Sequence, residues 1–227
     1  TPISVIQGYA NLLDRWGKHD EKTMQEAIDA IKSETENMKS LVEQLLFLAR
    51  GDNETIHMEK TLFDSGKVVE EIVRETRLID PAHTFEIEVD GPGYIEADQQ
   101  LIKQAVRILV DNSIKYTPAG GKIQLKVGKE GDTVKIRVQD NGIGIAPEDV
   151  ARIFDRFYRS DESRARKTGG SGLGLAIAKW IVDHHDGDYE VLSRVDIGTR
   201  ITLLFPAAEA EAETGEARTG PASAGPV

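Results

Sequence analysis

The chain has 227 residues, of which 39% are hydrophobic and 30% are charged, so it can bury one sizeable core and a smaller element. Its formal net charge of −11 argues against nucleic acid as a partner, because nucleic-acid-binding proteins usually present clustered basic side chains. It contains no cysteine, which excludes disulfides, cysteine-bound zinc and a thiol nucleophile, and no run of about 18 apolar residues, so we expect no membrane contact in this part of the protein.

Apolar residues recur at helical spacing through residues 1–50. Ile3, Ile6, Ala10 and Leu13 lie three or four positions apart, before a break at 17–20. A second stretch continues the pattern on one heptad seam through Met24, Ile28, Ile31, Met38, Val42 and Leu45. The pattern predicts a helical hairpin. Two helices alone cannot bury so wide an apolar face, so a homodimer that completes a four-helix bundle is favoured over packing on the chain's own second domain.

The rest of the chain divides by composition. Residues 51–65 are polar and turn-rich, which indicates a linker, and 66–206 form a second domain. Its expected helices lie near 69–76, over 98–116 and from 172 onward, and its expected strands lie at 84–89, 122–127, 134–138, 189–193 and 199–205. This order predicts an α+β chain: a hairpin, then an α/β sandwich whose mixed sheet is covered on one face by helices. The acidic tail, 207–227, is expected to be disordered.

Three polar segments stand out in the second domain: 111–118 at the end of a helix, 140–145 after a strand, and 169–175 at the start of a helix. A glycine-rich turn that opens a helix presents unpaired backbone N–H groups to an anion, and the helix dipole adds to the attraction. Gly172 and Gly174 would let a phosphate approach the backbone. Taken alone, these glycines could equally serve only to cap and pack the helix.

The other two segments supply candidate ligand contacts. The Asp140 carboxylate could accept a hydrogen bond from the exocyclic amine of adenine, although Asp-Asn-Gly is also a good turn sequence. Asn112 and Lys115 share a helix face, where an amide oxygen suits a metal ion and an ammonium suits phosphates. A solvated helix end would explain that pair as well if it stood alone.

The order of the three segments resembles the ATP-binding domain of bacterial sensor histidine kinases, within the wider group of gyrase, Hsp90 and MutL ATPases. Residues 153–159 look like the aromatic box of this family, and Gly198-Thr199 matches its last nucleotide contact. The amino-terminal hairpin resembles its dimerisation and phosphotransfer bundle. The resemblance covers residues 1 to about 206 and implies the Bergerat ATPase fold.

The resemblance also implies roles for individual residues. Asn112 would ligate Mg²⁺, Lys115 would contact phosphate, Tyr116 would lie against adenine or ribose, and Asp140 would bind the adenine amine. The remaining implied ATP contacts are Gly142, Gly144, Ile145, Phe157, Arg159, Gly170, Gly172, Leu173, Gly174 and Thr199. Residues 146–168 would form a mobile lid with the cationic side chains Arg156, Arg159, Arg164, Arg166 and Lys167.

The sequence departs from the family pattern in two places. Thr1-Pro2 fills only the last two places of the phosphoacceptor motif His-Glu-x-x-Thr/Asn-Pro, and none of the five histidines, such as His19, stands in that context. We therefore expect a fragment that cannot autophosphorylate. Thr1 occupies the position that in the family helps to dephosphorylate the response regulator, but the neighbouring motif residues are missing, so we expect Thr1 to be inactive. The second departure is Ile108, where the family usually has Asn or Glu. Because Ile cannot act as a base, we expect slow ATP hydrolysis.

The implied function is the catalytic core of a two-component histidine kinase, in the cytoplasmic part of a membrane-anchored parent. The γ-phosphate of Mg-ATP would pass to a histidine and then to an aspartate of a response regulator docked on the hairpin. Two alternatives remain open at this point: a conformational ATPase like Hsp90 or MutL, and a scaffold that only dimerises or binds nucleotide without catalysis.

Overall fold

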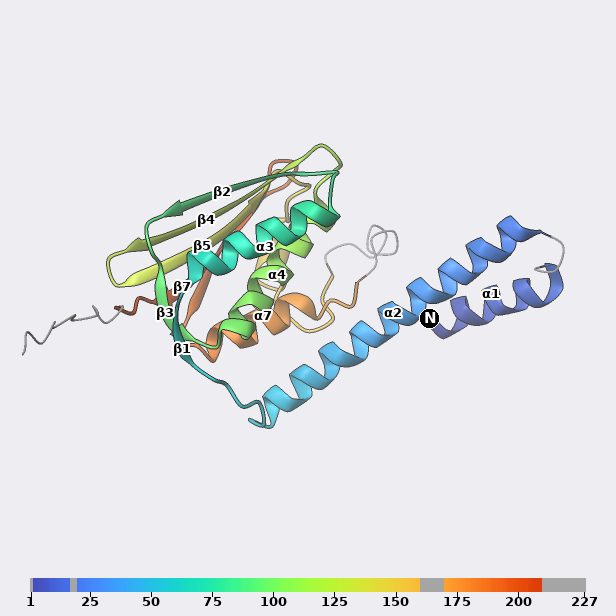
Figure 1. Ribbon diagram of the computed structural model, residues 1–227, viewed down its shortest axis with the longest axis horizontal. Helices are drawn as coiled ribbons and strands as arrows, with labels where there is room; N and C mark the ends of the chain where they lie inside the picture. Colours follow the sequence, from blue (N-terminus) through green and yellow to red (C-terminus); the bar gives the residue numbers. More distant parts are fainter. Residues whose placement is uncertain (1, 17–19, 160–169, 210–227) are drawn as a thin grey trace, which may run out of the picture.

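The computed structural model describes residues 2–16, 20–159 and 170–209 (Figure 1). Thr1, His19, the part of the predicted lid from 160 to 168 and the tail from 210 onward lie outside the described residues. The predictions made for these positions, including the cationic residues Arg164, Arg166 and Lys167, stay predictions.

A helical hairpin forms the amino-terminal part, as the periodicity predicts. Helix α1 spans Pro2–Trp16 and α2 spans Glu21–Asp52. The carboxylate of Asp20 caps α2 by accepting a hydrogen bond from the backbone N–H of Lys22 at 3.1 Å. Figure 1 shows α2 running from the sandwich outward, with α1 folded back beside its distal half. No helix in the described ranges is long and apolar enough to cross a bilayer.

The second part contains a five-stranded sheet in the order β2-β4-β5-β7-β6. Its strands are β2 (Thr84–Asp90), β4 (Lys122–Glu130), β5 (Thr133–Asp140), β6 (Asp188–Arg194) and β7 (Gly198–Pro206). Strands β2 and β4 run parallel and all other neighbours run antiparallel, so the sheet is mixed, as predicted.

A second, two-stranded sheet was not foreseen from the sequence. It pairs β1 (Thr61–Asp64) antiparallel with β3 (Tyr94–Ala97). Strand β1 falls inside the stretch 51–65 that the composition indicates as linker. Four residues give too little alternation to reveal a strand, and it is the pairing with β3 that stabilises it.

Helices α3 (Ser65–Ile79), α4 (Gln99–Tyr116) and α7 (Gly174–Asp183) cover one face of the large sheet (Figure 1). A short helix, α5, spans Pro147–Val150. The core lies between these helices and the alternate strand residues that face them, such as Leu125, Ile136 and Leu203. Asp98, the first residue of the predicted 98–116 helix, caps α4, since its carboxylate accepts hydrogen bonds from the N–H groups of Gln100 and Leu101. This layering leaves the amino end of α7 and the polar face of α4 at one edge of the domain.

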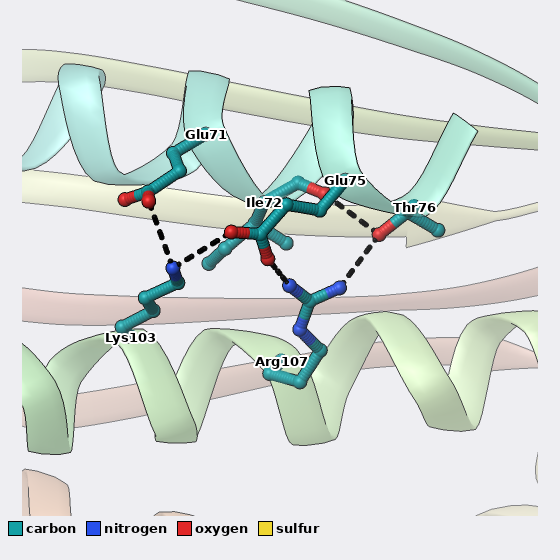
Figure 2. A network of polar contacts seen from close by, with 6 residues as sticks. All are labelled: Glu71, Ile72, Glu75, Thr76, Lys103 and Arg107. Atoms are coloured by element: carbon teal, nitrogen blue, oxygen red, sulfur yellow. Dashed lines mark hydrogen bonds and ion pairs between the residues drawn. The ribbon is translucent and has the colours of Figure 1, made fainter. Parts of the chain in front are cut away.

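Charged side chains join α3 to α4 (Figure 2). Lys103 of α4 contacts Glu71 and Glu75 of α3 at 3.0 Å each. Arg107, one turn further along α4, pairs with Glu75 and donates a hydrogen bond to the Thr76 hydroxyl at 2.9 Å. The hydrogen bond from Lys103 is the largest factor that lowers the pKa of Glu75. The network joins α4 to α3 on the side away from the cavity, while the buried apolar residues of α4 set the rotation of the helix.

The end of α2 contacts the second part directly. The rings of Phe47 and Trp180 meet edge to face, with centroids 5.1 Å apart. Gly51 lies so close to Trp180 that a Cβ atom at Gly51 would stand 2.6 Å from the indole nitrogen. Asp52 accepts two hydrogen bonds from Arg156, at 2.6 and 2.7 Å. The hairpin is therefore docked on α7 and on the segment that follows α5.

Candidate nucleotide-binding site

A cavity of about 330 Å³ opens between α4, the glycine-rich turn before α7 and the ends of β5 and β7. Its volume lies in the range of small-molecule sites. Eleven of the fourteen residues predicted to contact ATP line it: Asn112, Lys115, Tyr116, Asp140, Gly144, Ile145, Arg159, Gly170, Gly172, Gly174 and Thr199. Three segments that lie far apart in the sequence thus meet around a single hollow.

Asp140 forms one end of the cavity, at the end of β5. Its Oδ1 accepts hydrogen bonds from the backbone N–H groups of Gly142 at 2.9 Å and Thr199 at 3.2 Å. Its Oδ2 accepts one from the Ser113 hydroxyl at 3.2 Å. Burial raises the pKa of Asp140, and these three donors oppose that rise by stabilising the carboxylate. The carboxylate is thereby held in one orientation, with lone-pair capacity left for an amine donor.

Gly144 lies at the same end, where the loop after β5 packs closely against the end of β6. Its φ is +69°, and a Cβ atom there would lie 2.0 Å from the carbonyl oxygen of Arg194. Hydrogen bonds on either side hold the contact: the Asp196 N–H donates to the Ile143 carbonyl, and the Ile145 N–H donates to the Ser193 hydroxyl, each at 2.8 Å. A glycine is therefore required for this wall of the cavity to close.

The glycine-rich turn and α7 form the other end. In the described part of the chain, no side chain caps α7 at its N-cap residue, Leu173, so the first N–H groups of the helix remain available to an anion. Gly170 (φ +103°) and Gly172 (φ +74°) take backbone conformations that other residues rarely adopt. A Cβ atom at Gly170 would lie 2.4 Å from the amine of Lys115, so this turn brings a cation next to the helix terminus.

One face of α4 spans the cavity between its two ends. Ile108, Asp111, Asn112 and Lys115 line it at the i, i+3, i+4 and i+7 spacing of a helix face. Near the carboxyl end of α4, Ser113 bonds Asp140, whereas the Ile108 side chain would lie 3.3 Å from a Cβ atom at Gly174. Five residues of helix rise about 7.5 Å, so these two contacts mark different ends of the cavity.

The family now follows from comparison with known proteins. The family described as histidine kinase-, DNA gyrase B- and HSP90-like ATPase matches residues 97–209, and the His Kinase A (phospho-acceptor) domain matches residues 1–54. The chain belongs to the sensor histidine kinase family. Both matches fall on the parts that the hairpin and the cavity occupy in this kinase core.

Individual relatives agree with this assignment. The kinase core is 37% identical to the sensor histidine kinase YkoH of Bacillus subtilis (strain 168) over 206 residues, which are 90% of this chain and 44% of YkoH. It therefore spans less than half the length of that relative. The solved structure of the Acinetobacter baumannii histidine kinase AdeS matches with a TM-score of 0.69 and 26% identity, over 92% of this chain and 96% of the solved chain.

A solved complex of the histidine kinase ThkA with the response regulator protein TrrA also matches the kinase core. The TM-score is 0.72 and the sequence identity 25%, and the match covers 92% of this chain and 58% of the solved chain. Both parts of the kinase core, the hairpin and the sandwich, therefore have counterparts in solved histidine kinases.

Three residues predicted as ATP contacts lie outside the cavity lining. Gly142 lies behind Asp140, where a Cβ atom would stand 2.4 Å from the carbonyl oxygen of Tyr116. Leu173 is completely buried in the core. Phe157 exposes 59% of its surface and bonds the glycine-rich turn by its backbone, since its N–H donates to the Gly172 carbonyl at 3.0 Å. In this structure each of the three therefore lies next to a lining residue of the kinase core's cavity without lining it.

Other lining residues were not singled out from the sequence. Gln44 reaches the cavity from α2 and accepts a hydrogen bond from the Ser171 hydroxyl at 2.5 Å, and Ser171 in turn accepts one from the Leu173 N–H at 3.1 Å. No local pattern could reveal Gln44, because it joins the site only when the hairpin docks. Asp111 and Ser113 stand inside the 111–118 segment, and the i, i+4 spacing of Asp111 to Lys115 was a usable signal for Asp111.

A histidine stands just behind the carboxyl end of α4. The ring of His83 lies 2.7 Å from the Asp80 carboxylate through Nδ1 and 3.0 Å from the Thr117 carbonyl through Nε2. Because both partners are acceptors, both contacts are hydrogen bonds only when the ring carries two protons. Burial by itself lowers the pKa of His83, but the Thr117 carbonyl and Asp80 raise it more, and the net shift is upward.

Proposed function

We propose that the chain is the ATP-binding catalytic core of a two-component sensor kinase, which passes the γ-phosphate of ATP to a histidine and from there to a response regulator. The observation that carries the proposal is the single cavity, in which Asp140 stands at one end and the uncapped start of α7 at the other. A carboxylate that can accept from an amine and a helix terminus that can bind an anion suit the two ends of ATP.

Each predicted residue has a task in that arrangement. The Asp140 carboxylate would accept a hydrogen bond from the adenine amine, with Thr199 and Gly144 beside it and Tyr116 and Ile145 along the base or ribose. At the phosphate end, Gly170, Gly172 and Gly174 would admit the phosphates to the backbone, and Lys115 and Arg159 would supply positive charge. Because transfer of a phosphoryl group depends mainly on position and charge, these residues supply what the step requires.

The cavity also fits a divalent cation, because Asn112 lines it with an amide group whose oxygen is a hard ligand. Asn112 would hold Mg²⁺, which when bound neutralises phosphate charge and so favours transfer. Ile108 offers neither an oxygen ligand nor a base on the next turn of α4. Ile108 itself therefore could not activate water near the phosphates, which would help to spare ATP until a histidine attacks.

The hairpin carries the surfaces to which the proposed partners would bind. Ile3, Val5, Val42, Leu45 and Leu46 each expose 41% or more of their surface in the single chain. A second copy would bury this apolar face in a four-helix bundle, which is the homodimer that the periodicity predicts. A response regulator would dock mainly on the hairpin; the likeness to ThkA, which was solved in complex with the response regulator protein TrrA, supports a partner of this class. The site of action would be the cytoplasm, where ATP and response regulators are found.

The test is a calorimetric titration of Mg-ATP into the chain, with phosphate release followed for hours in the same sample. We expect saturable binding and negligible phosphate release, which is the behaviour of a kinase core that holds ATP without hydrolysing it. Binding with steady turnover would favour the conformational ATPase instead. No binding in a folded sample would exclude the proposed function and leave a scaffold.

A further inference from the structure

Two of the described residues that line the cavity carry a carboxylate: Asp140 and Asp111. Asp140 is engaged with three donors of the protein itself, from Ser113, Gly142 and Thr199. Its position is therefore fixed by the protein at the end assigned to adenine. Asp111 stands one residue before Asn112 on α4, on the stretch that leads from that end toward the glycine-rich turn. The two carboxylates thus face different parts of a bound nucleotide.

Asp111 differs from Asp140 in its surroundings. Within the described parts of the chain, its carboxylate makes no hydrogen bond and no ion pair, and its side chain is exposed to the hollow of the cavity. Arg107, one turn earlier on α4, acts on it only through longer-range attraction. The carboxylate is open to water, but it stands on a wall that is to receive phosphates, and a negative charge repels phosphates unless a cation lies between them.

Figure 2 explains why the nearby cations do not supply that compensation. Arg107 extends toward α3, where it pairs with Glu75 and donates to Thr76 at 2.9 Å. Lys103 extends the same way and contacts Glu71 and Glu75 at 3.0 Å each. Both cations on the two turns before Asp111 are held on the side of α3, and the amine of Lys115, on the turn after it, lies beside Gly170 of the glycine-rich turn. The negative charge of Asp111 is therefore left to whatever enters the cavity.

A nucleotide triphosphate alone cannot meet that charge, because its phosphates are themselves anionic. The species that can meet it is the divalent cation that accompanies the triphosphate. Mg²⁺ prefers oxygen ligands and is commonly bound through one or two carboxylates together with substrate phosphates and waters. The neighbouring Asn112 offers a neutral oxygen, and Ile108, on the preceding turn, offers none. Asp111 is thus the anionic oxygen donor on the metal side of the cavity.

We propose that Asp111 binds the magnesium ion of Mg-ATP together with Asn112, directly or through one of the ion's waters, and makes nucleotide binding depend on the metal. The inference rests on the proposed function, since it assumes that the phosphates of ATP lie beside α4. It gives Asp111 two opposite effects. With Mg²⁺ the carboxylate attracts the bound ion, and without Mg²⁺ it repels the phosphates.

The test compares the wild-type chain with Asp111→Asn, which keeps the shape of the side chain and removes its charge. Calorimetry would give the Kd of ATP in excess EDTA and in excess Mg²⁺ for each protein. We expect Mg²⁺ to strengthen ATP binding in the wild type, and we expect Asp111→Asn to reduce that gain by about 10-fold or more. In EDTA the variant should bind ATP at least as tightly as the wild type, because the repulsion is gone.

A direct reading of the metal uses Mn²⁺ in place of Mg²⁺. Electron paramagnetic resonance of free Mn²⁺, in the presence of the chain and a non-hydrolysable ATP analogue, should show less bound Mn²⁺ in Asp111→Asn. Asp111→Glu keeps the charge and should retain most of the bound ion. Glu70→Gln is the matched control, because it removes one negative charge from an exposed position of α3 that does not line the cavity. It should leave both measurements unchanged.

The outcomes separate the inference from the proposed function. If the wild type binds no ATP with or without metal, the proposed function fails first. If Mg²⁺ strengthens binding equally in the wild type and in Asp111→Asn, the function stands and Asp111 is not a metal-side residue. If Asp111→Asn binds ATP more tightly by the same factor in EDTA and in Mg²⁺, Asp111 only repels phosphate and the inference is overturned. A thermal melt of each variant shows whether a loss reflects unfolding.

Discussion

Replacing Gly144 by alanine tests the backbone contact that closes the adenine end of the cavity. The substitution adds one methyl group at φ +69°, where it would stand 2.0 Å from the Arg194 carbonyl oxygen. Alanine in the left-handed conformation costs about 1 kcal/mol. The overlap cannot be relieved without moving one backbone by about 1 Å, which endangers the two flanking hydrogen bonds at about 1 kcal/mol each. We therefore expect a loss of about 3 kcal/mol in the free energy of unfolding.

Gly131→Ala provides the matched control. Gly131 sits in the turn between β4 and β5 at φ +59°, and a Cβ atom there would meet nothing within 4 Å. This variant carries the same backbone strain without the overlap, so it should lose only about 1 kcal/mol. Its turn does not line the cavity, and its affinity for ATP should match that of the wild type.

Urea unfolding of the three proteins and calorimetric titration with Mg-ATP would measure both effects. In Gly144→Ala a displaced wall should weaken ATP binding by about 10-fold or more, because a shift of about 1 Å misplaces the contacts to the base. Equal losses of stability in the two variants, or an unchanged Kd for ATP in Gly144→Ala, would refute the assignment of this contact to the wall of the site.

Two further predictions concern contacts outside the cavity's ends. His83→Gln should lose stability relative to the wild type most strongly below the ordinary histidine pKa of 6.5, and the difference should shrink as pH rises through the raised pKa of His83. Burial raises the pKa of Asp80, but the hydrogen bonds from His83 and from the Ala82 N–H, together with the charge of His83, lower it more, so the net pKa is lowered and the Asp80 side of the pair persists down to acidic pH. A pH-independent difference in urea unfolding would contradict the doubly protonated ring. A double-mutant cycle of Gln44→Ala and Ser171→Ala should give a coupling of about 1 kcal/mol in unfolding, and strictly additive losses would show that this bond between hairpin and turn contributes nothing.

Much of the fold was predictable, because the longer helices and strands repeat a periodic pattern of apolar residues several times. Each of these elements shows its pattern over enough residues to be recognised from the local sequence. Examples are the helical period of α4, the alternation of β4 and β5, and the heptad seam of α2. Strands β1 and β3 escaped prediction since four residues carry too little alternation. Helix α7 starts at Gly174 rather than Gly172, because both Gly170 and Gly172 take left-handed backbone conformations that no helix contains.

The candidate site, like the fold, was predictable only in part from the sequence. The sequence by itself determined which chemical groups are present: Asp140, Asn112, Lys115 and the glycines before α7 stand in segments whose order alone indicates a nucleotide site. Only the tertiary structure decided which of them face the cavity, because burial depends on neighbours that are distant along the chain. It placed Leu173 in the core, left Asp111 without a partner in the described part of the chain, and brought Gln44 from the hairpin to the glycine-rich turn. Such contacts arise from packing between elements, and no local pattern encodes them.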